Sequence, residues 1–126
     1  MVLDASAAFV ALQRDGRTRH EISGVSLHAP HLIDAEVVHA LRRQVLAGDR
    51  TPDEAFDQLA TWQDVEVERH PSAPILRRVW DLRSNLSAYD AHYVALAERL
   101  GCVLVTLDRR IEGAPGIGCE VLVLDG

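Results

Sequence analysis

Residues 86–108 constrain the fold of this chain more than any other stretch, because they read as a helix followed directly by a buried strand. Ser87 can cap the first helical turn, and Gly101 stands where a left-handed residue would end the helix. The run from Cys102 to Val105 is short, apolar and rich in β-branched residues, which is typical of a strand covered on both faces. The stretch therefore predicts one helix–strand unit of a parallel sheet.

Strands alternate with helices along the rest of the chain. Thr51, Pro52 and Glu54 give a full helix start signal, with a cap, a proline at the first helical position and a carboxylate placed to return the capping bond. Expected strands cover 2–3, 25–28, 65–67, 102–105 and a buried final run at 121–124; expected helices cover 6–12, 20–22, 32–46, 51–62, a segment opening at Pro74, and 87–100. This alternation predicts an α/β three-layer sandwich with a mostly parallel sheet.

Helical spacing also predicts which side chains face the core. The segment 32–46 has apolar residues three and four apart, the segment after Pro74 has a similar stripe, and two tyrosines lie in the first turns of the helix 87–100. Three groups are therefore expected to be buried: Val38, Leu41 and Val45; Leu76, Val79 and Trp80; and Tyr89 with Tyr93.

Length and composition fit a single domain over residues 1–126, which at this size buries somewhat over ~60% of its unfolded surface. Cys102 and Cys119 precede apolar runs and suit small buried thiols better than a disulfide. The opening Met-Val-Leu-Asp has no charged and apolar leader, and no apolar run approaches the roughly 18 residues of a membrane span. We therefore expect a soluble, cytoplasmic protein with no membrane partner.

The charge balance excludes several function classes. The net charge is −6, and all thirteen basic residues are arginine. Without lysine the chain has no Gly-Lys-Ser/Thr phosphate loop, no Schiff-base chemistry and no receiver-type aspartate phosphoacceptor. The acidic balance argues against broad non-specific binding of nucleic acid, but it is compatible with a local arginine lining.

Four acids occupy comparable places in the predicted elements. Asp4 and Asp108 follow strand ends, and Glu36 and Asp90 stand in the first turns of helices. In a parallel α/β fold these places lie at one edge of the sheet, so the four side chains can meet. Two carboxylates about 4 Å apart repel by about 1 kcal/mol in water and about 4 kcal/mol at an effective dielectric near 20. A divalent cation reverses that sign, and carboxylates with waters suit Mg²⁺ or Mn²⁺.

Each acid also has a structural interpretation, although the one for Asp4 is weak. Asp90 stands three residues after a capping serine and can simply support that cap. Glu36 can favour the helix dipole while Asp34 acts as the N-cap. Asp108 can be a turn residue paired with a neighbouring arginine. Asp4 follows two apolar residues of the opening strand and has little structural purpose there. Among the four acids, it is therefore the strongest indication of a functional cluster.

Other candidate sites rank lower. His31 and His39 are about two helical turns apart, roughly 12 Å, which is too far to share one ion. A zinc site built from these, His92 and the cysteines is therefore disfavoured, and His92 suits a solvated or packed histidine. Ser6 lacks the elbow motif and the placed histidine of a serine nucleophile.

Several stretches together resemble the motifs of a known family. They are Val2-Leu3-Asp4-Ala5-Ser6; Ala29-Pro30 followed by Glu36-Val37 and Ala40-Leu41; Leu86-Ser87-Ala88-Tyr89-Asp90-Ala91 with Tyr93-Val94-Ala95-Leu96-Ala97; and Leu104-Val105-Thr106-Leu107-Asp108-Arg109. They resemble PIN-domain ribonucleases, most closely the VapC toxins of bacterial toxin–antitoxin pairs, over nearly the whole chain.

The resemblance implies a PIN-like five-stranded parallel sheet of order 3-2-1-4-5 and a Mg²⁺-dependent endoribonuclease, with Mn²⁺ as a possible substitute. It also implies a homodimer and a cognate antitoxin whose tail covers the acidic pocket. The family's acidic quartet matches Asp4, Glu36, Asp90 and Asp108, and its supporting hydroxyl positions match Ser6 and Thr106.

The resulting hypothesis is hydrolysis of RNA phosphodiester bonds by a metal-activated water. Asp4 and Asp90 are then the primary metal ligands, Glu36 and Asp108 hold a second ion or position the attacking water, and arginines such as Arg109 contact the RNA backbone. One alternative is a catalytically silent PIN-like binding or scaffold module, which an incomplete quartet would favour. Another is a structure-specific DNA nuclease on the same fold, whose usual large insertions have no room here.

Overall fold

The computed structural model describes residues 1–125, in which five strands form one sheet of order β3-β2-β1-β4-β5. Every neighbouring pair is parallel. The strands are β1 (Val2–Leu3), β2 (Leu27–Pro30), β3 (Val67–His70), β4 (Leu104–Thr106) and β5 (Val121–Val123). This sheet confirms the α/β class and the strand order that the family resemblance implied.

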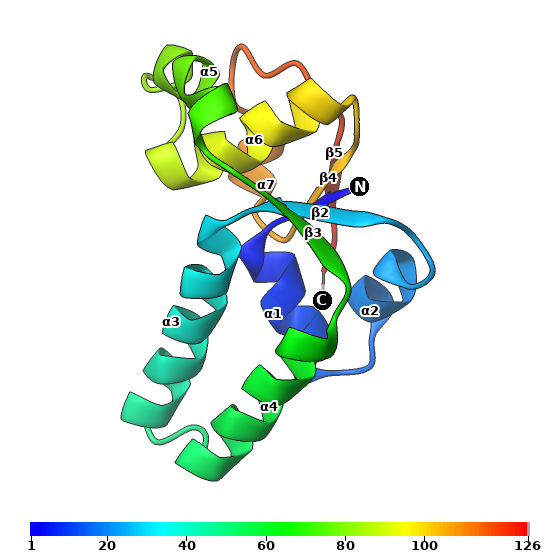
Figure 1. Ribbon diagram of the computed structural model, residues 1–126, viewed down its shortest axis with the longest axis vertical. Coiled ribbons are helices and arrows are strands. Elements are labelled where there is room, and N and C mark those ends of the chain that lie inside the picture. The colour runs from blue at the N-terminus through cyan, green and yellow to red at the C-terminus, as the bar shows by residue number, and fades with distance from the viewer. Residues whose placement is uncertain (126) are drawn as a thin grey trace.

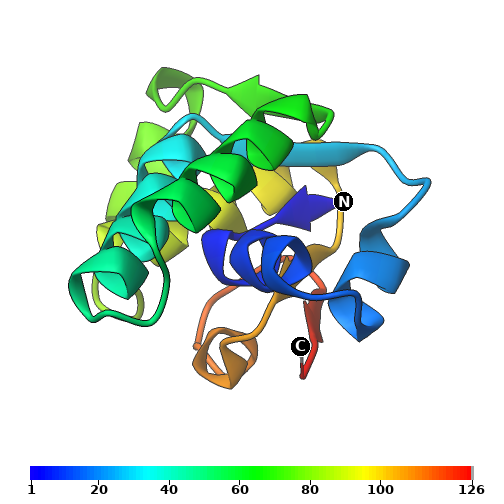
Figure 2. The same cartoon turned by 90° about the horizontal axis from the view of Figure 1, so that it is seen from below.

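Helices cover both faces of the sheet and make the expected three layers. Figure 1 shows α1, α3 and α4 on one side of the strands and α5 and α6 on the other, and Figure 2 shows the same arrangement from below. The helices are α1 (Ala5–Gln13), α2 (Arg17–Ile22), α3 (Leu32–Leu46), α4 (Pro52–Asp64), α5 (Leu76–Asp81), α6 (Ala88–Leu100) and α7 (Arg109–Glu112), with a 3₁₀ turn at Ala73–Ile75 before α5.

The local start and stop signals behave as their sequence predicts. Thr51 caps α4 through its side chain, which accepts from the Glu54 N–H at 3.1 Å, and Glu54 returns the bond to the Thr51 N–H at 3.0 Å. Ser87 caps α6, and Gly101 ends it with a φ of 64°, a conformation that favours glycine. These signals fix the ends of two helices without help from the core.

Four strand predictions were wrong in detail, and β3 and β4 run over Val67–His70 and Leu104–Thr106 rather than over 65–67 and 102–105. The second strand runs from Leu27 to Pro30 rather than from 25 to 28, and Pro30 belongs to the strand instead of interrupting it. Beyond His28, β2 pairs with β3 alone, so a residue without an N–H is tolerated there. The last strand, β5, is half-buried rather than buried, because it lies at the edge of the sheet.

The buried face of α3 differs by one residue from the predicted face. Val38 is 45% exposed, whereas Ile33, Val37 and Leu41, spaced four apart, are buried. Three-and-four spacing allows both stripes, and the position of the sheet selects the one that contains Val37.

The other two core predictions were partly wrong. Trp80 is 65% exposed, with its ring under the Arg83 guanidinium at 4.6 Å, and Leu76 is 50% exposed, while Val79 on the same helix is buried as expected. Tyr93 is buried, but Tyr89 is 64% exposed. An amphipathic aromatic at the edge of a stripe can lie on the surface when a cation covers its face.

Cys102 and Cys119 are both free thiols, but they are half-buried rather than buried as predicted. Over residues 1–125, no helix combines the length and the hydropathy needed to cross a bilayer.

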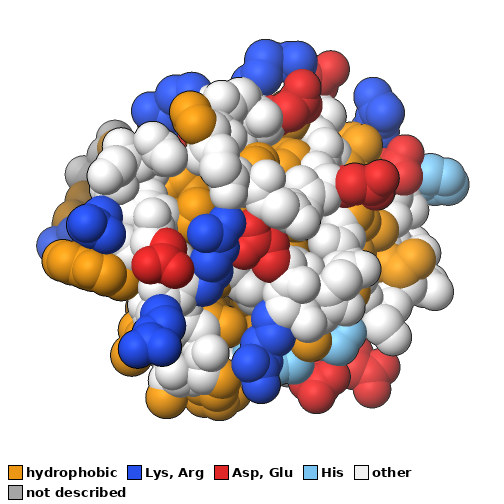
Figure 3. All heavy atoms as spheres, turned by 90° about the horizontal axis from the view of Figure 1, so that it is seen from above, with side chains coloured by type: hydrophobic (Ala, Val, Ile, Leu, Met, Phe, Trp, Pro, Cys, Tyr) orange, Lys and Arg blue, Asp and Glu red, His pale blue; other side chains and the backbone are white. Residues whose placement is uncertain are grey.

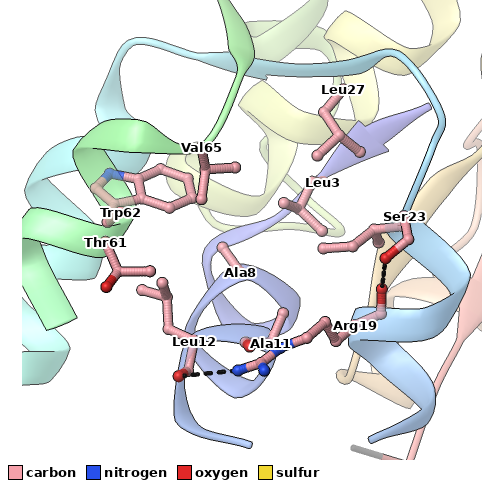
Figure 4. Close-up of a pocket in the computed structure, with 11 residues that line it drawn as sticks. Leu3, Ala8, Ala11, Leu12, Arg19, Ser23, Leu27, Thr61, Trp62 and Val65 are labelled. Atoms are coloured by element: carbon pink, nitrogen blue, oxygen red, sulfur yellow. Dashed lines mark hydrogen bonds between the residues drawn. The ribbon is translucent and has the colours of Figure 1, made fainter. Parts of the chain in front are cut away.

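An apolar pocket of about 320 Å³ lies between β1, α1, α2 and α4 (Figure 4). Its lining includes Leu3, Ala8, Trp62 and Val65, and its one charged side chain is Arg19. The Arg19 guanidinium donates to the backbone oxygens near the end of α1, to Ala11 at 2.8 Å and to Leu12 at 3.3 Å. None of the four candidate acids lines this pocket, so the candidate chemistry lies elsewhere.

Candidate active site

Asp4 lies directly after the central strand β1 and caps α1. Its side chain is only 6% exposed, and its Oδ1 accepts from the Ala7 N–H at 3.0 Å and from the Ser6 hydroxyl at 2.6 Å. The Thr106 hydroxyl, on the adjacent strand β4, donates to Oδ2. Burial raises the pKa of Asp4 although these hydrogen bonds oppose it, and the charge of Asp90 raises it further. A buried carboxylate is therefore fixed at the carboxyl end of the sheet.

The two hydroxyls around Asp4 form a closed network. Ser6 Oγ accepts from the Leu107 N–H, and Thr106 Oγ1 accepts from the Asp108 N–H, both at 3.0 Å. Each hydroxyl has one proton and gives it to Asp4, so the 3.4 Å contact between the two hydroxyl oxygens is left without a proton to share. The network joins the ends of β1 and β4.

Glu36 projects from α3 toward the same place. It lies in the second turn of the helix, four residues after Leu32, and not in the first turn as predicted. Its Oε1 accepts from the buried Tyr93 hydroxyl at 2.6 Å. Burial raises the pKa of Glu36 against the lowering effect of the Tyr93 hydrogen bond, and the charges of Asp4 and Asp90 raise it further. Burial raises the pKa of Tyr93 far above its ordinary value and the hydrogen bond to Glu36 raises it further, so the hydroxyl stays a donor.

Asp34 is not the N-cap of α3, a place that His31 takes without a side-chain bond. Its carboxylate instead accepts from Arg69, through Nε at 2.7 Å and Nη2 at 2.9 Å, and from Trp62 Nε1 at 2.8 Å. The Arg69 bonds lower the pKa of Asp34. This acid therefore ties α3 to α4 and β3, and the prediction of a capping role was wrong.

Arginine pairing also fixes Glu98 of α6. Its carboxylate accepts from Arg78 at 2.6 and 3.0 Å and from the Gly118 N–H at 2.5 Å, and these bonds lower the pKa of Glu98. On the face shown in Figure 3, arginine and acidic side chains are likewise interspersed rather than gathered by sign. Asp34 and Glu98 are thus each held in an arginine pair.

Asp90 sits in the first turn of α6 as predicted. Its N–H donates to Ser87 Oγ at 3.1 Å, but among residues 1–125 no bond returns from its carboxylate to the Ser87 N–H. The cap therefore uses the backbone N–H of Asp90, and Ser87 also lowers the pKa of the Asp90 carboxylate. Burial raises the pKa of Asp90, and so does the charge of Asp108, against opposing effects of Ser87 and Arg110.

Asp108 caps the short helix α7 and is paired. It accepts from the Arg110 N–H at 3.0 Å and from the Arg110 guanidinium at 3.0 and 2.7 Å. These bonds lower the pKa of Asp108. The turn-and-arginine interpretation was right about the local bonding, with Arg110 as the partner. Arg109 lies instead 3.7 Å from Asp125, and both side chains are exposed.

The structure brings the four acids to one end of the sheet, with unequal charge compensation. Asp4, Glu36 and Asp90 each have a raised pKa to which at least one neighbouring acid contributes, and within residues 1–125 none of the three is in an ion pair. Asp108 adjoins Asp90 but is paired. Repulsion among three unpaired carboxylates is the cost that a bound cation removes.

The spacing of these acids bears on which ion fits. Over the described residues, no three acids of this set offer oxygens that all lie within 4.8 Å of one another. One ion would therefore contact only some of the carboxylates directly and reach the others through water. Mg²⁺ favours oxygen ligands and usually keeps several waters, so this all-oxygen set fits it.

A groove of about 990 Å³ runs beside the acids. Ser6, Glu36 and Leu107 form the part of its lining that belongs to the site, and Arg43 and Tyr89 extend it along α3 and the start of α6. Sequence reasoning missed Arg43 and the Tyr93–Glu36 bond, because each depends on tertiary contacts. Arg110 gave a local signal, its position two residues after an acid at a strand end.

His92 is a packed histidine. Its Nδ1 donates to the Ala88 oxygen at 2.6 Å, and its Nε2 lies 3.1 Å from Ser72 Oγ. Its charge lowers the pKa of Glu36 slightly against the larger effects that raise it. The ring is therefore held by two partners beside the site.

Comparison with known proteins identifies the family. The PIN domain profile matches residues 1–117. The chain is 43% identical over 124 residues to Ribonuclease VapC9 of Mycobacterium tuberculosis strain H37Rv, covering 98% of both chains. It is 40% identical over 125 residues to Ribonuclease VapC1 of the same strain, covering 95% of this chain and 94% of that one.

A solved structure supports the fold. The crystal structure of VapBC2 from Rickettsia felis, bound to a DNA fragment from its promoter, matches with a TM-score of 0.73 at 12% identity and covers 98% of both chains. Fold, motifs and relatives agree across the chain. The protein therefore belongs to the PIN-domain family and, within it, to the VapC-type toxins.

Proposed function

We propose that this protein is a metal-dependent endoribonuclease that acts in the cytoplasm as the toxin of a type II toxin–antitoxin pair. The observation that carries the proposal is the convergence of Asp4, Glu36 and Asp90 at one end of the sheet, with raised pKa values and, within residues 1–125, no ion pair to an arginine. The relatives named as ribonucleases, 43% and 40% identical, support the choice of RNA as substrate.

In this proposal the four acids bind Mg²⁺ or position the attacking water, and Mn²⁺ can substitute for Mg²⁺. Asp4 and Asp90 are the primary ligands, and Glu36 and Asp108 hold a second ion or position the attacking water. When bound, the metal would supply an activated water and positive charge opposite the phosphate. Asp108 is the outermost member, because Arg110 occupies its oxygens.

The supporting residues keep the acids in place. Ser6 and Thr106 fix the orientation of the Asp4 carboxylate, and each donates to a different oxygen. Tyr93 holds Oε1 of Glu36, so Oε2 remains available to accept from a water. Rigid placement of charged groups before substrate arrives is what makes such sites effective.

The groove beside the acids is the proposed path of the RNA strand. Tyr89 is 64% exposed in its lining, where a base can stack on the ring, and Arg43 can contact a phosphate. Stacking on an aromatic ring is worth about 1–3 kcal/mol per base, so Tyr89→Ala should raise KM more than it lowers kcat.

Cleavage of a structured RNA tests the proposal. We expect cleavage by the wild type in Mg²⁺, none in EDTA, and none by Asp90→Asn. Asp34→Asn is the matched control, because it removes a carboxylate of the same chain that is paired with Arg69 rather than turned to the site. Cleavage that survives EDTA, or equal activity of wild type and Asp90→Asn, would reject the mechanism and favour a silent scaffold.

Metal binding can be followed without activity. By linkage, Mg²⁺ should raise the Tm of the wild type and raise that of Asp90→Asn much less. Equal shifts in the two proteins would mean that the Asp90 carboxylate does not contact the ion.

The proposed partners are a cognate antitoxin, whose tail would cover the acidic pocket, and a second copy of the chain. The VapC names of the relatives and the VapBC2 neighbour support the antitoxin. Induction of the wild type in a bacterium should arrest growth and degrade RNA, whereas Asp90→Asn should not. Co-expression with the product of an adjacent small open reading frame should restore growth, and sedimentation should give the mass of a dimer.

A further inference from the structure

Three potential metal ligands lie together on the strand pair β2–β3. They are His28, Glu68 and His70, and one nitrogen or oxygen atom of each lies within 4.8 Å of the other two. His28 and Glu68 are direct partners in the parallel register, and His70 follows Glu68 by two residues, so all three project from the same face of the sheet. The register itself therefore assembles the cluster.

The measured separations match the geometry of a tetrahedral ion. His28 Nδ1 is 3.0 Å from His70 Nε2 and 3.3 Å from Glu68 Oε2. Zinc bonds to nitrogen and oxygen are about 2.1 Å, which places neighbouring ligand atoms of a tetrahedron about 3.4 Å apart. Two imidazoles and one carboxylate also form a donor set that Zn²⁺ binds in proteins.

A hydrogen-bond network explains the same contacts less completely. His28 Nδ1 has at most one proton, and it faces both His70 Nε2 and the Glu68 carboxylate. One of the two contacts is then left without a proton from this nitrogen. A single cation at the centre satisfies all three atoms at once.

The cluster has room for a further ligand and is separate from the acidic site. A hollow of about 630 Å³ is lined by His28 and Glu68, so water can complete the coordination of an ion. Neither residue belongs to the acidic groove, and His70 does not line it either. The His31 N–H donates to the His70 oxygen at 3.0 Å, which continues the strand pairing up to the start of α3.

We propose that His28, Glu68 and His70 bind one Zn²⁺ ion that cross-links the edge strand β3 to β2. The ion stabilises the sheet at its outer edge, next to the start of the helix that bears Glu36. This site is independent of the proposed nuclease function, because it shares no ligand with the acidic quartet.

Zinc titration of the metal-free protein tests the proposal, with affinity measured by competition against a chromophoric chelator. We expect one tight Zn²⁺ per wild-type chain and a higher Tm with Zn²⁺. His70→Gln and Glu68→Gln should each weaken binding at least tenfold, since loss of a merely supporting residue already costs about 10–100-fold. Both side chains are at least partly exposed, so the variants should fold, as circular dichroism checks.

The controls separate this site from the other possible ligands. His39→Gln removes a histidine outside the cluster, and Asp90→Asn removes an acid of the quartet; both should keep the wild-type zinc affinity. Co²⁺ should give visible d–d absorption in the wild type that His70→Gln abolishes. Wild-type zinc affinity in His70→Gln, a loss caused by Asp90→Asn, or no tight zinc in the wild type would each overturn the assignment.

Discussion

Two acids of α3, Asp34 and Glu36, lie two residues apart and have opposite environments. Asp34 accepts three hydrogen bonds from Arg69 and Trp62, and its pKa is lowered. Glu36 accepts one bond from Tyr93, faces other acids, and its pKa is raised. The charged form of Asp34 stabilises the fold, whereas the charged form of Glu36 destabilises it through burial and repulsion from other acids. The partner, not the residue type or its helical position, decides which role an acid takes.

The largest predicted effect is on catalytic activity. It should distinguish the unpaired acids of the site, such as Asp90, from the arginine-paired acid Asp34. Asp90→Asn should lower RNA cleavage at least 100-fold, because loss of one charge-stabilising group from a prearranged site costs about 10²–10³ in rate. Asp34→Asn should retain cleavage per folded molecule. Initial rates at saturating RNA measure both; a similar loss in the two variants would erase the distinction between paired and unpaired acids.

A smaller loss should follow when the support of Asp4 is removed. Thr106→Val keeps the volume but leaves Asp4 Oδ2 and the Asp108 N–H without their partner. We expect a stability loss of about 1–3 kcal/mol, and roughly tenfold slower cleavage. Urea unfolding and initial rates check this, with Thr61→Val on the exposed side of α4 as control. Unchanged values would show that the hydroxyl has no supporting role.

The paired acid should matter for stability instead. Asp34→Asn removes the charge from a partly exposed pair, and we expect a loss of about 1–2 kcal/mol after allowing for solvent screening. Glu36→Gln should be neutral or stabilising in metal-free protein, because repulsion from Asp4 and Asp90 is relieved. Urea midpoints in EDTA measure both, and a larger loss for Glu36→Gln would reverse the comparison.

The two groups should also differ in pH dependence. The pKa of Asp90 is raised in the folded protein, so the folded state binds more protons than the unfolded chain between the unfolded value of about 3.9 and the folded one. Its contribution to stability is present below that window and is lost as pH rises through the folded pKa. The pKa of Asp34 is lowered in the folded protein, so Asp34 contributes to stability at pH values above its unfolded pKa. This contribution is lost as pH falls through the folded pKa.

In EDTA, the wild type should therefore gain stability relative to Asp90→Asn as pH falls from 7.5 to about 4.5, and lose it relative to Asp34→Asn only at lower pH. Urea midpoints across this range measure the differences. A difference in urea midpoint between the wild type and Asp90→Asn that stays constant across this pH range would contradict the raised pKa of Asp90.

The smallest effect concerns Asp108, which shares features of both groups. Arg110→Ala removes the guanidinium that lowers its pKa. The pKa of Asp108 should rise, with little change in stability because Arg110 is exposed. An NMR titration of the Asp108 carboxyl carbon measures the shift, and Arg109→Ala, whose partner is Asp125, is the control. An unchanged pKa would mean that backbone bonds alone hold this carboxylate.

Local sequence signals were sufficient for much of the fold. The helix 32–46 has the predicted bounds, Thr51 and Gly101 mark helix ends as expected, and the acids lie at one end of a parallel sheet, whereas the order of its strands was implied only by the family resemblance. These features depend on residues within one turn or on the topology of parallel sheets. They require no knowledge of distant partners.

What the sequence left open are contacts between distant residues. Asp34 finds Arg69, 35 residues away, and this pairing turned a predicted cap into a tertiary link. The choice of Val37 over Val38 depends on where the sheet lies under α3. The cluster of His28 with His70 depends on the register of two strands 42 residues apart. Spacing within one element contains none of this information.

The hydrogen bond between Asp4 and Thr106 spans 102 residues, so it can form only late in the synthesis of the chain. During synthesis β1 emerges first, yet both of its neighbours in the sheet arrive later, and β4 only when most of the chain exists. A nascent polypeptide that stops short of this strand lacks the hydroxyl that orients its most buried acid. The growing chain therefore cannot complete this part of the site until the final fifth of translation, when Thr106 has been added.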